Sequence, residues 1–112
     1  MDTQKTMIKQ KMEELGESIE SFVTAIAVND IGEKDRLYPL CIAQIQAVFP
    51  LIIQYYTRPE MKPYEQELKE WSDQLTRIMQ AIKGRDMFFL VDVLKFETRE
   101  NLLYLLDLMD TN

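Results

Sequence analysis

The chain has 112 residues, 46% of them hydrophobic and 29% charged, and this length and balance predict a single globular domain over residues 1–112. Its 19 acidic and 13 basic residues give a net charge of −6, which makes nucleic acid and anionic membranes unfavourable partners. The sequence contains no histidine, which excludes Ser-His and Cys-His dyads and the Glu-x-x-His di-iron motif. We therefore predict no enzymatic activity, no cofactor and no metal.

Cysteine usage and the N-terminal sequence favour a cytoplasmic protein. Cys41 is the only cysteine, so no intrachain disulfide can form, and an unpaired thiol beside seven methionines is typical of a reducing compartment. The N-terminal sequence lacks the apolar segment of a signal peptide, and charged or amide side chains interrupt the apolar stretches, so no membrane span is expected. Cys41 falls at an inward helix position without a histidine to activate it, which favours a buried structural thiol.

Apolar spacing predicts a first helix over residues 3–28 and a second over residues 33–56. The inner face of the second helix is expected to comprise Leu37, Cys41, Ile45, Val48, Ile52 and Tyr55 or Tyr56. Asp30 and Glu33 are placed to form a capping box at the start of the second helix. Pro39 is compatible with a first turn, whereas Pro50 is interior, removes a backbone hydrogen bond and predicts a kink. The first helix carries its apolar residues in alternating steps of four and three, the seam of a packed helix: Ile8, Met12, Leu15, Ile19, Phe22 and Ile26.

A third helix is predicted from residue 63 or 64 to residue 83, after a proline-bounded loop over residues 58–63. Its apolar residues again alternate steps of four and three: Tyr64, Leu68, Trp71, Leu75, Ile78 and Ile82. Gly84 is expected to be the left-handed residue that ends this helix, and Asp86 to cap the fourth. So short a connection makes the third and fourth helices an antiparallel hairpin. Four amphipathic helices with short loops, and no strand-like alternation, predict an all-α, antiparallel, up-down four-helix bundle.

The predicted fourth helix, over residues 87–109, carries two apolar stripes where a monomeric bundle needs one. Glu97 and Asn101 fall on or beside the core-facing stripe. Glu97 is either part of a polar network that binds a ligand or fixes the register, or an edge carboxylate that reaches water, and we favour the edge position. The core-facing stripe has helical spacing: Met87, Leu90, Val91, Leu94, Leu105, Leu108 and Met109.

The second stripe of this helix is the main functional clue. Phe89, Phe96 and Leu103 are spaced by sevens and point away from the core-facing stripe. They form either a surface for a partner or, if the fourth helix is central in the fold, contacts with the first or second helix. Asp92 and Arg99 flank the stripe and would form the charged rim of an interface.

Aromatic residues gather around the proline-bounded loop. Tyr55 and Tyr56 end the second helix, and Tyr64 and Trp71 lie early in the third, so the four are expected at one end of the bundle. Such a cluster can line a small apolar pocket. We favour the alternative, in which it closes the end of the core.

These features favour a non-enzymatic, cytoplasmic, acidic bundle that works through protein–protein contacts, as a homodimer formed by the fourth helix. One alternative is a small export or assembly chaperone that holds a client helix, because such chaperones share this composition. Another is a small-ligand-binding bundle that uses the aromatic end together with Asp92 or Glu97.

Overall fold

A computed structural model describes residues 3–111 of the chain, and those residues form helices and no strand. The all-α, four-helix class predicted from the sequence is confirmed. A fourth helix (residues 87–111) is built from three consecutive segments: α4 (Met87–Val93), a π-helical segment η2 (Leu94–Thr98) and α5 (Arg99–Thr111). The first three are α1 (Thr3–Ala27), α2 (Ile31–Tyr56) and α3 (Glu65–Lys83), with a short 3₁₀ segment η1 (Pro59–Tyr64) before α3.

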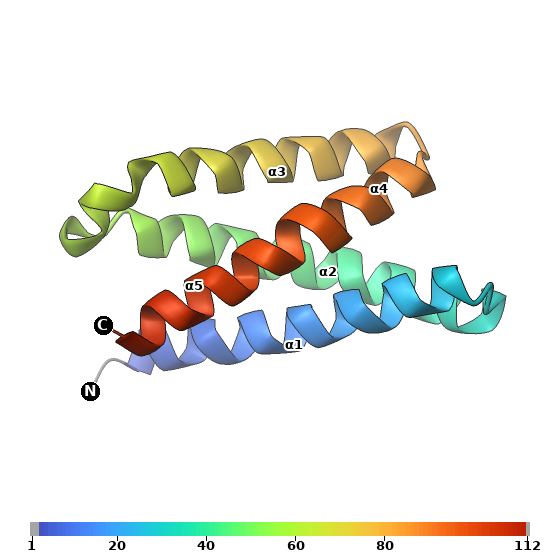
Figure 1. The fold of residues 1–112 in the computed structure, drawn as a ribbon, viewed down its shortest axis with the longest axis horizontal. Helices are drawn as coiled ribbons and strands as arrows, with labels where there is room; N and C mark the ends of the chain where they lie inside the picture. Colours follow the sequence, from blue (N-terminus) through green and yellow to red (C-terminus); the bar gives the residue numbers. More distant parts are fainter. Residues whose placement is uncertain (1–2, 112) are drawn as a thin grey trace.

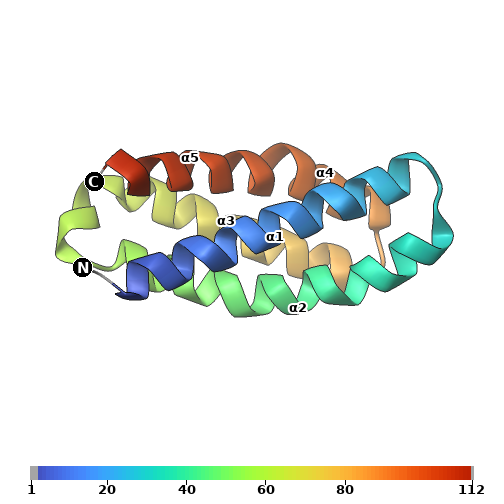
Figure 2. The same ribbon diagram turned by 90° about the horizontal axis from the view of Figure 1, so that it is seen from below.

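The helices lie along one long axis, and the fourth helix crosses the others (Figure 1). α1 packs on α2 and α2 packs on α3, while the fourth helix contacts α3 through α4 and α1 through α5. Figure 2 shows α2 and the fourth helix on opposite sides of the molecule. Both chain ends lie at one end of the bundle (Figure 1), where Lys9 of α1 forms an ion pair with Asp110 of α5. The fourth helix is therefore an outer element, held along its length by α1 and α3.

Two similar turns connect α1 to α2 and α3 to α4. In each, an aspartate caps the following helix: the Asp30 carboxylate accepts from the Glu33 N–H at 3.1 Å, and the Asp86 carboxylate accepts from the Phe89 N–H at 3.0 Å. Both caps were predicted. The residue before each aspartate has positive φ, 56° at Asn29 and 53° at Arg85.

The expectation that Gly84 is the left-handed residue is wrong, because its φ is −82°. The Asp86 N–H donates to the Ala81 carbonyl at 2.9 Å, and the Arg85 N–H donates to the Ile82 carbonyl at 3.1 Å. These two bonds define a Schellman turn whose left-handed position is Arg85, one residue later than predicted. The same two hydrogen bonds recur around Asn29 at the end of α1. In both turns the left-handed residue is therefore the one directly before the capping aspartate.

The core follows the predicted seams of α1 and α2 closely, and that of α3 less so. In α1, Ala25 is buried and Ile26 only half-buried. In α3, the buried positions include Gln74 and Ala81, while the predicted Leu68, Leu75 and Ile82 are half-buried against the core. α2 is one helix from Ile31, so Pro39 lies in its interior and the expectation of a first-turn position is wrong, while the kink at Pro50 stays a prediction. The buried residues of α2 are Leu37, Cys41, Ile45, Val48, Phe49, Ile52, Tyr55 and Tyr56.

The predicted core stripe of the fourth helix omits its middle residues, Thr98 and Leu102. Buried positions continue from Leu94 to Thr98 and Leu102, while Glu97 and Asn101 are only half-buried. The buried residues Leu90, Leu94, Thr98 and Leu102 are spaced by four. In a regular α-helix, three such steps would turn the side chain of the last residue about 120° away from the core. The π segment absorbs the excess by holding one extra residue, and the Arg99 N–H bonds to the Leu94 carbonyl five residues back.

Among residues 3–111, α2 alone has the length and apolar composition needed to cross a membrane. A core helix of a soluble protein passes the same test, and eight residues of α2 are buried against its neighbours here. The expectation that no segment spans a membrane therefore stays a prediction.

The π segment is tied to α3 by a buried hydrogen bond, and this bond predicts a stability effect. The Thr98 hydroxyl donates to the Gln74 side-chain oxygen at 3.1 Å, and both residues are buried. Thr98→Val should lower the free energy of unfolding by about 1–3 kcal/mol in urea denaturation, because it leaves the Gln74 amide buried and unpaired.

The matched control is the double variant Thr98→Val/Gln74→Met, which removes both partners and should lose less stability than Thr98→Val alone. If Thr98→Val unfolds at the wild-type urea concentration, the hydrogen bond does not hold the π segment in place.

Candidate protein-contact face on the fourth helix

The second apolar stripe of the fourth helix lies outside the core. Phe89, Phe96 and Leu103 are 37%, 63% and 55% exposed. The alternative in which a central fourth helix buries these residues against the first or second helix is therefore wrong. The fourth helix rests on α1 and α3 with this face turned outward (Figure 1). That a partner covers the face stays a prediction.

Two further residues belong to this face and were missed in the sequence. Phe88 is 84% exposed and Tyr104 is 48% exposed. Each is adjacent in sequence to a predicted member of the stripe. Both would have been identified if the sequence neighbours of the stripe residues had also been counted as outward-facing. We call the set the outer face, which comprises Phe88, Phe89, Phe96, Leu103 and Tyr104.

One edge of the outer face runs beside α1. Phe88 and Asp92 border a hollow shared with Ala25 and Ile26 at the end of α1. Further along, Lys95 and Arg99 border a groove with α1, and Arg99 and Leu103 border the next groove. We call this row the α1 edge, and it reads in order Phe88, Asp92, Lys95, Arg99 and Leu103.

The charged members of the α1 edge have specific neighbours. Asp92 is exposed, as a rim residue should be. The Arg99 guanidinium lies 3.6 Å from the Glu20 carboxylate of α1. The Lys95 ammonium lies 5.1 Å from the centre of the Phe96 ring, a cation–π contact that holds Lys95 against the apolar stripe. Asp92 and Arg99 therefore lie on the same edge of the stripe, and their role as the rim of an interface stays a prediction.

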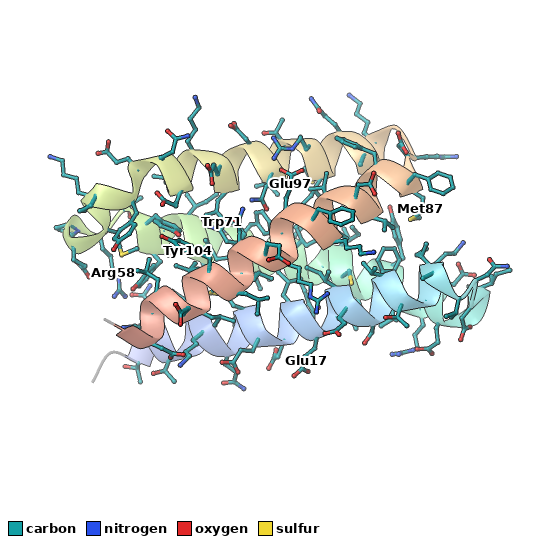
Figure 3. All side chains as sticks on the ribbon, viewed as in Figure 1. Glu17, Arg58, Trp71, Met87, Glu97 and Tyr104 are labelled. Carbon is teal, nitrogen blue, oxygen red and sulfur yellow. The ribbon has the colours of Figure 1, made fainter. Side chains whose placement is uncertain are left out.

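The opposite edge faces α3. Glu97 forms an ion pair with Arg77 of α3, and its side chain is 40% exposed. Figure 3 shows Glu97 and Tyr104 on the side of the fourth helix nearest α3. The favoured interpretation of Glu97 as an edge carboxylate that reaches water is confirmed, and Asn101 beside it is half-buried.

The aromatic end of the bundle is mostly closed. Tyr55, Tyr56 and Trp71 are buried, and the Trp71 ring packs edge-on against Phe49 with centroids 5.3 Å apart. Burial raises the pKa of Tyr56 to about 12. A surface hollow remains at this end, but neither Tyr56 nor Trp71 lines it. Its walls are Tyr55, Glu60, Met61, Pro63 and Tyr64.

Cys41 is 1% exposed, and its thiol donates to the Ser18 carbonyl at 3.3 Å. Burial raises the pKa of the thiol to about 11, so it is protonated and unreactive near neutral pH. The prediction of a buried thiol is confirmed. Within residues 3–111, no group of three or more cysteine, aspartate or glutamate side chains is arranged to hold a metal ion.

α2 presents a second exposed face that was not predicted from the sequence. No charged residue occurs between Leu37 and Thr57, although 29% of the chain is charged. The missed signal was this charge-free run. Its outward residues are mainly small or proline, so this face offers less apolar area than the outer face of the fourth helix. They include Pro39, Leu40, Ala43, Ala47 and Pro50.

Comparison with known proteins assigns no family to this chain. No protein-family model, no curated protein and no solved structure matches it. A functional proposal for the chain must therefore stand on its own residues and their geometry.

The buried thiol predicts how stability depends on alkaline pH. In the folded protein the Cys41 pKa is about 11, against 9.0 for an unperturbed thiol, so between these values the unfolded chain releases a proton that the folded chain keeps. The free energy of unfolding should therefore be constant below about pH 9 and fall as the pH rises towards 11.

Urea denaturation at intervals from pH 8 to pH 11 measures this dependence. Cys41→Ser keeps a hydrogen-bond donor near the Ser18 carbonyl and does not titrate in this range, so it should flatten the curve between pH 9 and 10. Above that range the Tyr56 hydroxyl, whose pKa burial also raises, still contributes. Equal slopes for wild type and Cys41→Ser would contradict the burial of the thiol.

Proposed function

We propose that this chain is a non-enzymatic protein of the reducing cytoplasm that works through protein–protein contact, and that its first partner is a second copy of itself. The observation that carries the proposal is the outer face: five large apolar side chains exposed on one helix. Aromatic residues are enriched in the buried centres of interfaces, and three of these five are phenylalanines.

The outer face is large enough to form the apolar centre of a dimer interface. Given their exposed fractions and the usual areas of such side chains, its residues together expose on the order of 500 Å². That matches the largest apolar patches of ordinary monomers, which are often functional. A standard interface buries about 800 Å² on each partner, so the flanking charged side chains would supply the remainder.

The distribution of charge also supports contact at this face. Two copies of a chain with net charge −6 repel one another, most strongly where acidic residues gather. α1 carries such a cluster on exposed positions: Glu13, Glu14, Glu17 and Glu20. The middle of the fourth helix instead mixes both signs around its apolar stripe, with Asp92, Lys95, Glu97, Arg99 and Glu100. Like-charged copies can approach more closely at this part of the fourth helix than at the acidic segment of α1.

The proposal predicts that polar substitutions on the outer face separate the copies without unfolding them. Wild type should give a mass near twice 13.3 kDa by size-exclusion chromatography with light scattering. Phe89→Ser/Phe96→Ser should give a folded monomer, because both side chains are exposed in the single chain and their loss leaves no core cavity. Circular dichroism confirms that the variant stays helical.

Val28→Ser is the matched control, since Val28 is 67% exposed but lies outside the outer face, and this variant should remain a dimer. A wild-type monomer at every concentration would contradict self-association. A dimer that survives Phe89→Ser/Phe96→Ser would also contradict the proposal, and would direct attention to the uncharged face of α2.

A further inference from the structure

The α1 edge has an order that is nearly symmetric about its centre. Asp92 and Arg99 lie equally far from the point midway between Lys95 and Phe96, and Phe88 and Leu103 also lie equally far from that point. About this centre the apolar Phe88 is matched by the apolar Leu103, and the acidic Asp92 is matched by the basic Arg99.

This symmetry has a direct meaning for a two-fold dimer. When two helices pack antiparallel across a two-fold axis, each residue meets the residue equally far on the other side of the axis, and each edge of a helix meets the same edge of its copy. With the axis between Lys95 and Phe96, Phe88 of one copy would meet Leu103 of the other. Asp92 of one copy would meet Arg99 of the other, and this pair would occur twice.

We infer that the second copy binds antiparallel, with the two-fold axis crossing the fourth helix between Lys95 and Phe96. The inference rests on the proposed function, since it specifies how the same face meets its copy. Charge complementarity selects this orientation. In a parallel pair the α1 edge of each copy would meet the opposite edge of the other, so Asp92 would lie near Glu97 and two acidic side chains would face each other.

The π segment supports the same centre. It spans Leu94–Thr98, so its middle residue is Phe96, next to the inferred axis. Any change that the segment makes in helix rise or direction is therefore shared equally by the two halves of the outer face. Phe96 is also among the most exposed residues of the stripe and carries the Lys95 ammonium over its ring. With the axis between these two residues, Phe96 of each copy would meet Lys95 of the other.

Distances between spin labels on the two copies test the orientation. Single-cysteine variants Glu100→Cys and Asp107→Cys, each on a Cys41→Ser background, place a nitroxide on exposed positions of the fourth helix. In the antiparallel dimer the label separation grows by two helical rises per residue from the axis. The Asp107 pair should then be about 20 Å further apart than the Glu100 pair in pulsed dipolar spectroscopy.

The possible outcomes separate the orientation from the proposed function. Equal separations at the two sites, together with a dimer mass, would mean a parallel pair; that overturns the inference and leaves the proposed function standing. A monomer mass, or a dimer mass with separations too large for contact at the fourth helix, would overturn both.

A single substitution gives a second test in which the two orientations predict opposite signs. Asp92→Asn removes two favourable ion pairs from an antiparallel dimer and should raise its dissociation constant about fivefold. In a parallel dimer it would remove a repulsion and lower the dissociation constant. Asp73→Asn on α3 is the matched control, because Asp73 is exposed and its loss changes net charge equally. The orientation is decided by whether Asp92→Asn raises or lowers the dissociation constant relative to Asp73→Asn.

Discussion

The fourth helix must keep a core seam in contact with α1 and α3 although that seam advances by four residues three times in succession. A regular α-helix cannot do this, because the drift would carry Thr98 and Leu102 out of the core. The π segment over Leu94–Thr98 corrects the drift, and Thr98 is held there by the buried Gln74. Arg77 fixes the neighbouring Glu97 from the same helix, α3. This local adjustment determines which side chains are left outside, with Phe96 at the middle of the segment.

Much of this architecture was predictable because it depends on local chemistry. Four helices, the capping roles of Asp30 and Asp86, and the seams of α1 and α2 follow from apolar spacing and from side chains that satisfy helix ends. The middle of the fourth seam was not predictable, because periodicity assumes a constant turn per residue and a π segment breaks that assumption. The left-handed position fell on Arg85 instead of Gly84 because the Schellman hydrogen bonds end at the capping aspartate. Phe88 and Tyr104 were missed because a spacing of seven selects one residue from each outward pair.

The candidate site is a surface, not a cavity, and its chemistry is that of association. Burial raises the pKa values of Cys41 and Tyr56, and both residues are buried in the core, so their titration reflects packing. The outer face combines exposed aromatic rings with charges of both signs in an otherwise acidic chain. Its near-symmetric order is the property expected of an isologous interface, in which one surface must complement itself. The uncharged face of α2, on the opposite side of the molecule, is the competing surface (Figure 2).

Small-angle X-ray scattering at concentrations where the dimer predominates tests the central claim most directly, because it reports mass and length together. The bundle is 43 Å long, and the fourth helix runs obliquely along one side of it (Figure 1). Two copies joined across this helix lie side by side, so the scattering particle should have twice the mass of one chain and a longest dimension well below twice 43 Å. A particle with the mass of one chain, or a doubled mass with a doubled length, would contradict the account.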